Sequence, residues 1–62
     1  MSEFERILLE CRFIISLNKN YLELADYFHV NVKTINYDLN CLLPKYDIEL
    51  YNKMKKMQKI KN

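Results

Sequence analysis

Residues 25–40 read ADYFHVNVKTINYDLN, and this stretch decides the fold because two short helical patterns meet in it at a tight corner. A helix of about eight residues is expected to follow its N-cap, Asn20. Its inner face is expected to carry three apolar residues, Leu24, Ala25 and Phe28. The pattern resets after His29, and Asn31 is expected to cap the next helix. Two helices joined by so short a turn are typical of a helix-turn-helix unit.

The corner lacks the glycine that usually forms it, and the whole chain contains none. The residue at such a turn commonly needs a positive φ, which glycine adopts without steric cost. His29 occupies this position, and histidine is one of the few other residue types enriched in the left-handed region. We therefore predict a positive φ at His29, at a cost of about 1 kcal/mol.

A further helix is predicted over residues 3–17, where apolar residues recur at intervals of three and four. These are Phe4, Ile7, Leu8, Cys11, Ile14 and Ile15. Ser2 and Glu5 have the spacing of a capping box at its start. Arg6 and Glu10, four residues apart, are expected to form a pair on the outer face, worth a few tenths of a kcal/mol at most.

The helix after the corner is predicted over about 32–42, and Pro44 is expected to end it or to follow its end closely. Its expected inward residues are Val32, Ile35, Leu39 and Leu42, and Val30 just before it, although the periodicity of Val32 also fits the outer face. Asp47 is expected to cap a last helix over about 47–60. That helix carries an apolar stripe of Leu50, Met54 and Met57, which fits either the core of the chain or a seam between two copies.

The fold class expected from these patterns is all-α. Residues 1–62 are expected to form a single helix-turn-helix domain, with the helix-turn-helix unit at about 20–42. It would have three core helices and a basic C-terminal helix. No apolar run approaches the roughly 20 residues that a membrane helix needs. The N-terminus, MSEFER, is acidic where a secretory signal is basic, so a cytoplasmic location is expected.

Charge is distributed unevenly along the chain. Residues 1–31 contain five acidic and three basic residues, whereas residues 32–62 contain seven lysines and three acidic residues. Five of these lysines follow Glu49, and no acidic residue does. This asymmetry indicates a surface for an anionic partner, with a solvated lysine tail as the alternative.

Residues 21–50, YLELADYFHVNVKTINYDLNCLLPKYDIEL, resemble the sporulation stage III protein D family of transcriptional regulators from endospore-forming bacteria. The matching features are Ala25, a turn in which His29 replaces glycine, the TINYDL pattern at 34–39 and the Leu-Pro pair at 43–44. The resemblance implies a bacterial sequence-specific DNA-binding regulator that acts at promoters, with RNA polymerase as a further partner and a role in sporulation. The second helix of the unit carries a single basic residue, Lys33, where members of the family tend to have more.

In a helix-turn-helix protein the second helix enters the major groove, and its outward N-terminal residues face the bases. The residues expected to contact bases are Lys33, Asn36 and Tyr37. Lysine can donate to guanine, and asparagine can pair with both N6 and N7 of adenine. The residues expected to contact the DNA backbone are Lys19, Tyr21, Asn31, Thr34, Lys53, Lys55 and Lys56. Asp38 lies within this surface, and we expect it to pair with a neighbouring lysine or to cap a helix end.

Other functions have less support in the sequence. We predict no catalytic site, no cofactor and no metal site, because neither a phosphate-binding loop nor metal-ligand spacing is present. The alternative function is a protein-interaction or dimerisation module without DNA binding, since five tyrosines are many for so short a chain. The run of lysines after Glu49 favours double-stranded DNA. Monomer and homodimer both remain open, as do the operator sequence and the direction of regulation.

Overall fold

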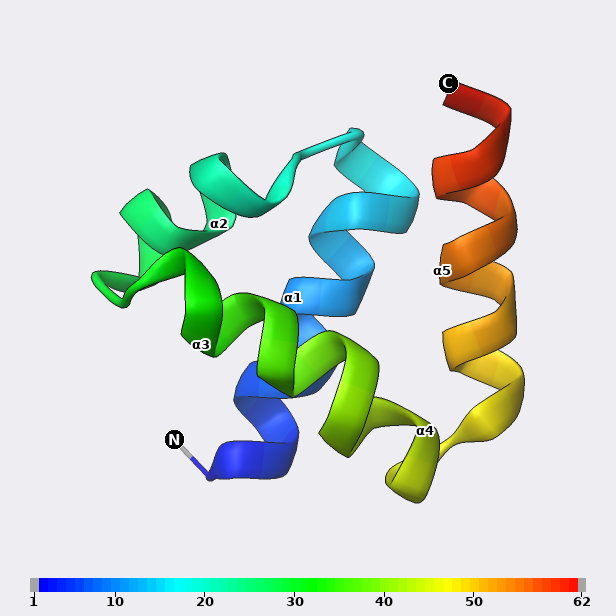
Figure 1. Cartoon of the computed structure of the whole chain (residues 1–62), viewed down its shortest axis with the longest axis horizontal. Coiled ribbons are helices and arrows are strands. Elements are labelled where there is room, and N and C mark those ends of the chain that lie inside the picture. Colours follow the sequence, from blue (N-terminus) through cyan, green and yellow to red (C-terminus); the bar gives the residue numbers. More distant parts are fainter. Residues whose placement is uncertain (1, 62) are drawn as a thin grey trace.

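The computed structural model describes the backbone of residues 2–61 and the side chains of residues 2–58. This part of the chain contains no strand, so the predicted all-α class is confirmed. The elements are α1 (Glu3–Leu17), α2 (Tyr21–Phe28), α3 (Val32–Tyr37), a π-helical turn η1 (Asp38–Leu42), α4 (Leu43–Tyr46) and α5 (Ile48–Lys61), as Figure 1 shows.

The helices begin where the sequence predicts. A side-chain oxygen of each predicted capping residue accepts a backbone N–H of the first helical turn: Ser2, Asn20, Asn31 and Asp47. The most complete cap is at α2, where Asn20 Oδ1 accepts from the Glu23 N–H at 2.9 Å and the Glu23 carboxylate accepts from the Asn20 N–H at 3.0 Å. Side chains adjacent in sequence therefore set the boundaries of the helices.

The corner between α2 and α3 has the predicted backbone geometry. His29 has φ 57° and ψ 46°, in the left-handed region. The N–H of Val30 bonds to the carbonyl of Ala25 at 3.0 Å, and that of His29 bonds to the carbonyl of Asp26 at 3.3 Å. This pairing is the usual left-handed termination of a helix. His29, whose side chain is exposed, therefore adopts the backbone conformation that glycine would normally adopt at this turn.

The prediction that Pro44 ends the third helix or closely follows its end is wrong, because Pro44 lies within the helical rod. α3, η1 and α4 follow one another without a break, and the helical rod ends only at Tyr46 (Figure 1). In a regular α-helix the ring of Pro44 would clash with the carbonyl of Asn40. The π turn just before it contains one extra residue, and the N–H of Leu43 bonds back to the carbonyl of Asp38. The wider turn admits the proline, which lies in the first turn of α4.

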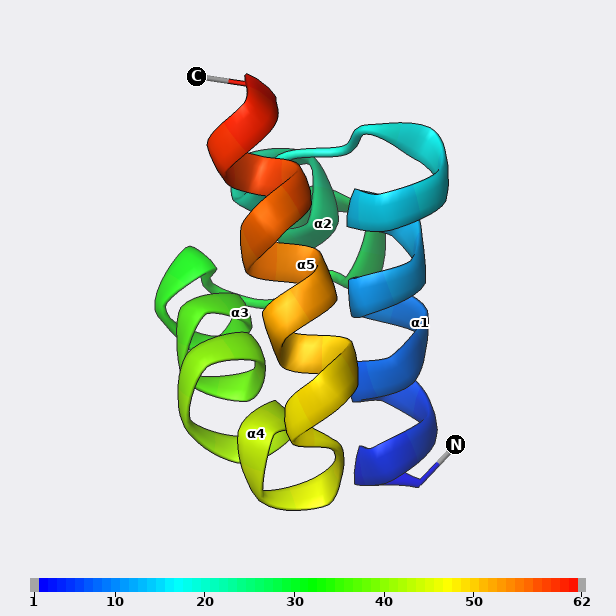
Figure 2. The same ribbon diagram turned by 90° about the vertical axis from the view of Figure 1, so that its right-hand side faces the viewer.

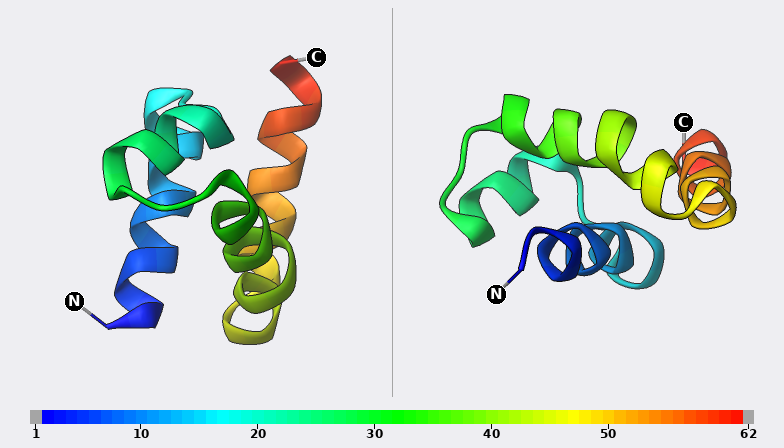
Figure 3. Two further views of the ribbon diagram at one scale, coloured as in Figure 1. Left: turned by 60° about the vertical axis from the view of Figure 1, so that its left-hand side comes forward. Right: turned by 90° about the horizontal axis from the view of Figure 1, so that it is seen from below.

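The helices pack in two layers. The rod formed by α3, η1 and α4 crosses in front of α1 in Figure 1, and the view from below in Figure 3 shows the two in separate layers. α5 runs beside α1 in the same direction (Figure 2). At the other end, α2 packs against α3. This arrangement leaves one side of the rod uncovered by another helix.

The core draws on every long helix. Its buried apolar residues are Ile7, Cys11, Ile14, Leu24, Ala25, Ile35, Leu39, Leu43 and Met54. Met54 is fully buried, so the centre of the α5 stripe belongs to the core of the chain itself and is not available as a seam between copies. Phe4, predicted to face inward, is 40% exposed, and Val32, whose periodicity fits either face, is 36% exposed. Phe4 packs instead against the ring of Tyr46 at the molecular edge.

Arg6 and Glu10 lie 3.6 Å apart, but not on the outer face as predicted, because Glu10 is fully buried. Arg6 is half-buried and forms a bidentate ion pair with Asp38, with Nε 3.1 Å from Oδ2 and Nη2 3.0 Å from Oδ1. Asp38 is only 1% exposed, and both its carboxylate oxygens bond to Arg6 and not, as predicted, to a neighbouring lysine or a helix end. This pair joins α1 to the middle of the rod. Such a bidentate contact restricts the relative rotation of the two helices more than apolar packing does.

Glu10 lies beside this ion pair and is fully buried. Its Oε2 is 3.6 Å from the Arg6 Nε, and neither of its carboxyl oxygens accepts a hydrogen bond from a described residue. Burial, then a hydrogen bond to Asp38 and its negative charge, raise the pKa of Glu10 to about 8, against a smaller lowering by Arg6. When Glu10 is protonated, its O–H can donate to the Asp38 carboxylate, and this hydrogen bond gives the buried Glu10 carboxyl group a partner. Glu10 is therefore mostly neutral near pH 7.

Replacing Glu10 by glutamine should remove a pH dependence of stability. The unfolded chain loses the Glu10 proton near pH 4.5, whereas the folded chain keeps it to about pH 8. Between these values the folded state binds more protons, so its stability falls as the pH rises. We expect equal stability of Glu10→Gln and wild type near pH 4.5, and an advantage of the variant on the order of 1–3 kcal/mol at pH 8. Urea unfolding across this range measures it, and a difference that is constant with pH would contradict the assignment.

Replacing His29 by glycine should stabilise the corner. Glycine has no Cβ to oppose the left-handed conformation, and this gain exceeds the extra entropy that glycine gives the unfolded chain. We expect His29→Gly to raise the free energy of unfolding by about 0.5–1 kcal/mol and His29→Val to lower it by more than about 1 kcal/mol. Asn18, with φ 58°, provides the control: Asn18→Gly should gain less, because asparagine tolerates this region well. Destabilisation by His29→Gly would show that the histidine side chain has another role.

Candidate nucleic-acid interface

The three residues predicted to contact bases lie on one exposed side of α3. Lys33 and Asn36 are exposed, and Tyr37 is 54% exposed. On the opposite side of the same rod, Ile35 and Asp38 are buried. The exposed side follows directly from the turn at residues 29–31, as the reading surface of a helix-turn-helix does.

Asn31 and Thr34, the two residues at the start of α3 that are predicted to contact the DNA backbone, differ in exposure and in their free hydrogen-bond donors. Asn31 is exposed, but its Oδ1 accepts the Lys33 N–H at 2.8 Å, which leaves its amide N–H groups for a phosphate. Thr34 is half-buried. Of these two side chains, Asn31 is the better placed for a phosphate contact.

Asn40, which the sequence analysis did not single out, joins three of the segments that carry predicted contacts. Its Nδ2 donates to the Tyr21 hydroxyl on α2 at 3.0 Å, and its Oδ1 accepts from the Tyr51 hydroxyl on α5 at 3.5 Å. Nδ2 also contacts the main-chain and side-chain oxygens of Asn36. The spacing of four residues between Asn36 and Asn40 is the one signal in the sequence that points to this network.

The network divides the lysines of α5 into two sides. Lys55 is four residues after Tyr51 and exposed, so it lies on the flank of α5 that faces Asn40. Lys53 lies on the other flank, near α1: burial raises the pKa of the Cys11 thiol to about 11, and the charge of Lys53 opposes that rise. Lys56 shares the side of Lys53. The side chains of the last two lysines of the chain fall outside the described residues.

The structure does not gather all the predicted contacts into one cluster. α5 lies at the opposite end of the molecule from the turn between α2 and α3 (Figures 1 and 3). Lys19 is exposed and pairs with Glu23 at 3.5 Å across one helical turn. An exposed pair of this kind is worth less than about 1 kcal/mol, so Lys19 is held only weakly. The compact part of the candidate interface is the side of α3 that continues through Asn40 to Lys55.

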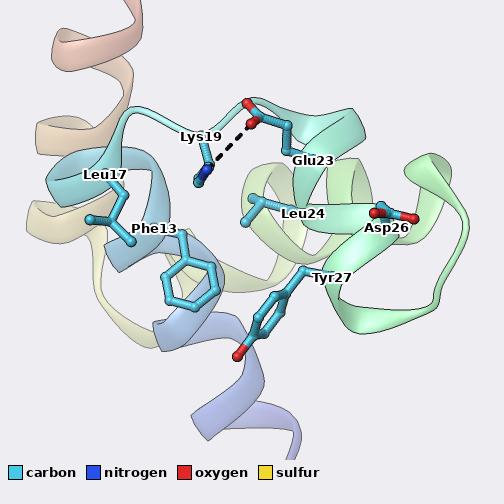
Figure 4. A pocket seen from close by; sticks show the side chains of 7 residues that line it. All are labelled: Phe13, Leu17, Lys19, Glu23, Leu24, Asp26 and Tyr27. Carbon is cyan, nitrogen blue, oxygen red and sulfur yellow. Dashed lines mark hydrogen bonds and ion pairs between the residues drawn. The ribbon is translucent and has the colours of Figure 1, made fainter.

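A second surface feature is an apolar groove between the end of α1 and α2 (Figure 4). Its lining residues are Phe13, Leu17, Lys19, Glu23, Leu24, Asp26 and Tyr27. The rings of Phe13 and Tyr27 meet edge to face at 5.0 Å. Of the lining side chains, only Leu24 is buried. The groove therefore has no buried polar group that would orient a small ligand.

Comparison with known protein families, with curated proteins and with solved structures found no match. Within the described residues, no helix is long and apolar enough to cross a membrane. Residues 2–58 also hold no group of three or more His, Cys, Asp and Glu side chains arranged to bind a metal ion.

Proposed function

We propose that the chain is a sequence-specific DNA-binding protein that regulates transcription, with α3 in the major groove and α5 against the phosphate backbone. The observation that carries this proposal is the exposed side of α3, where Lys33, Asn36 and Tyr37 stand together directly after the turn. All three can reach base edges from a helix in the major groove. The resemblance to the sporulation stage III protein D family supports the same function and adds a role at promoters.

The few charges on this side imply a modest affinity that weakens as the salt concentration rises. α3 supplies a single lysine, Lys33, and among the described side chains of α5 Lys55 lies on the flank of Tyr51, which contacts Asn40. Each lysine that neutralises a phosphate releases a counterion and adds roughly 0.9 to the slope of log affinity against log salt. With so few cations on the reading helix, the lysines of α5 supply a large share of the sequence-independent binding.

The direct test is binding of a labelled duplex, followed by fluorescence anisotropy over a salt series. We expect micromolar binding at low salt that weakens as salt increases, with a slope set by the number of lysines that contact phosphates. Lys33→Ala and Lys55→Ala should each lower the salt slope by about 1. Arg12→Ala is the matched control, because Arg12 is exposed on α1, the helix behind the rod in Figure 1, and loses the same charge.

Two results would contradict the proposal. The first is no binding of wild type even at low salt. The second is an equal change of slope in Arg12→Ala, which would mean that DNA responds only to total charge and not to this surface.

A second candidate function is protein binding through the groove between α1 and α2. Two of its lining residues, Leu17 and Tyr27, are 59% and 64% exposed. Exposed apolar and aromatic side chains in one place favour a protein contact. This function becomes the leading one if wild type fails to bind DNA.

A further inference from the structure

The amide of Asn36 is held by Asn40. Asn40 Nδ2 donates to Asn36 Oδ1, and it also contacts the Asn36 main-chain carbonyl at 3.1 Å. The main-chain oxygen can only accept, so it keeps the NH₂ group of Asn40 turned toward Asn36. The Tyr51 hydroxyl, at 3.5 Å, meets the oxygen end of the Asn40 amide. Asn40 is half-buried between these partners, which limits its rotation.

A fixed Asn40 fixes the orientation of Asn36. If the Asn36 amide turned by 180°, its NH₂ group would face the NH₂ group of Asn40, donor against donor. In the observed orientation Oδ1 uses one of its two acceptor sites for Asn40. The other acceptor site and the hydrogens of Nδ2 stay available, since no described residue accepts from Asn36 Nδ2.

The order of donor and acceptor on this amide matters in the major groove. Adenine presents a donor at N6 and an acceptor at N7, so an asparagine must meet it with its oxygen and its nitrogen in one order only. An amide that turns freely presents both orders and loses part of this discrimination. We propose that Asn40 is a positioning residue that holds the Asn36 amide in one orientation and so determines which base Asn36 recognises. This inference rests on the proposed DNA-binding function.

The test compares Asn40→Asp with wild type. Aspartate has the same shape and can still bond to the hydroxyls of Tyr21 and Tyr51, which rotate to donate. It cannot donate to Asn36 Oδ1, and it favours the turned amide, whose NH₂ group can donate to it. Preferred duplexes are first selected from a random library with wild type, and the base pair at which Asn36→Ala no longer discriminates is identified. Affinities for all four bases at that pair are then measured for each variant.

We expect wild type to prefer its base by roughly tenfold or more at this pair. Asn40→Asp should reduce the preference below about threefold or transfer it to another base, with preferences at other pairs unchanged. The added negative charge weakens binding to all sequences alike and so leaves this ratio unaffected. Tyr51→Phe provides a graded comparison: it removes one partner of Asn40 but leaves the contacts between Asn40 and Asn36, so it should reduce the preference less than Asn40→Asp does.

Asn40→Ala provides a second variant in case the aspartate disturbs folding, because alanine is the residue that helices favour most. It should lower the preference at the same pair without creating a new one. Circular dichroism shows whether each Asn40 variant is folded. If a folded variant keeps the wild-type preference at this base pair, the positioning role is overturned, while the proposed DNA binding is not. Failure of wild type to bind or select DNA would overturn the proposed function and this inference with it.

Discussion

The bidentate ion pair between Arg6 and Asp38 is the constraint on which the rest of the molecule depends. It joins α1 to the middle of the α3–α4 rod, with two N–O contacts of 3.0 and 3.1 Å. Because Asp38 faces α1, the rod can lie in only one rotation, and in that rotation Lys33, Asn36 and Tyr37 face away from the core. A neutral Glu10 beside the pair adds a donor without adding a second negative charge. The buried ion pair and the exposed side with Lys33, Asn36 and Tyr37 therefore lie on opposite sides of the same helical rod.

The apolar packing alone would specify this arrangement less well. The core holds nine buried apolar residues, most of them aliphatic, and such side chains accept small rotations of a helix. A buried carboxylate does not accept such a rotation. If the rotation separates it from its arginine, an unpaired charge is left in the core, at a cost of about 3–5 kcal/mol. The Asn40 network acts similarly two residues further along the rod, within η1. It fixes α2 and α5 against η1 through two tyrosine hydroxyls.

Local features of the fold could be predicted from the sequence, and features that depend on distant contacts could not. Caps at Asn20 and Asp47 and the left-handed His29 follow from residues adjacent in the chain. Glu10 was misplaced because helical periodicity assigns a charged residue to the solvent unless its partner is known, and its partner is 28 residues away. Pro44 was misread for a related reason: the π turn that admits it leaves no mark on hydrophobic periodicity.

The candidate site divides in the same way. The exposure of Lys33, Asn36 and Tyr37 could be predicted from the period of α3, because Ile35 fixes which side is inward. The role of Asn40 could not be predicted, because its partners Tyr21 and Tyr51 come from helices that precede and follow it in the sequence. Helical spacing separates Lys53 and Lys56 from Lys55, but it does not show which side faces α3. The contact between Tyr51 and Asn40 and the effect of Lys53 on Cys11 distinguish the flank of Lys55 from that of Lys53.

The most direct measurement is nuclear magnetic resonance of the ¹⁵N-labelled chain during titration with duplex DNA at low salt. We expect chemical shifts to change at the exposed residues of α3, at the Asn36 and Asn40 side-chain amides and around Lys55. The groove at Phe13 and Tyr27 should stay unchanged. Changes centred on that groove, or none up to millimolar DNA, would contradict a reading surface on α3.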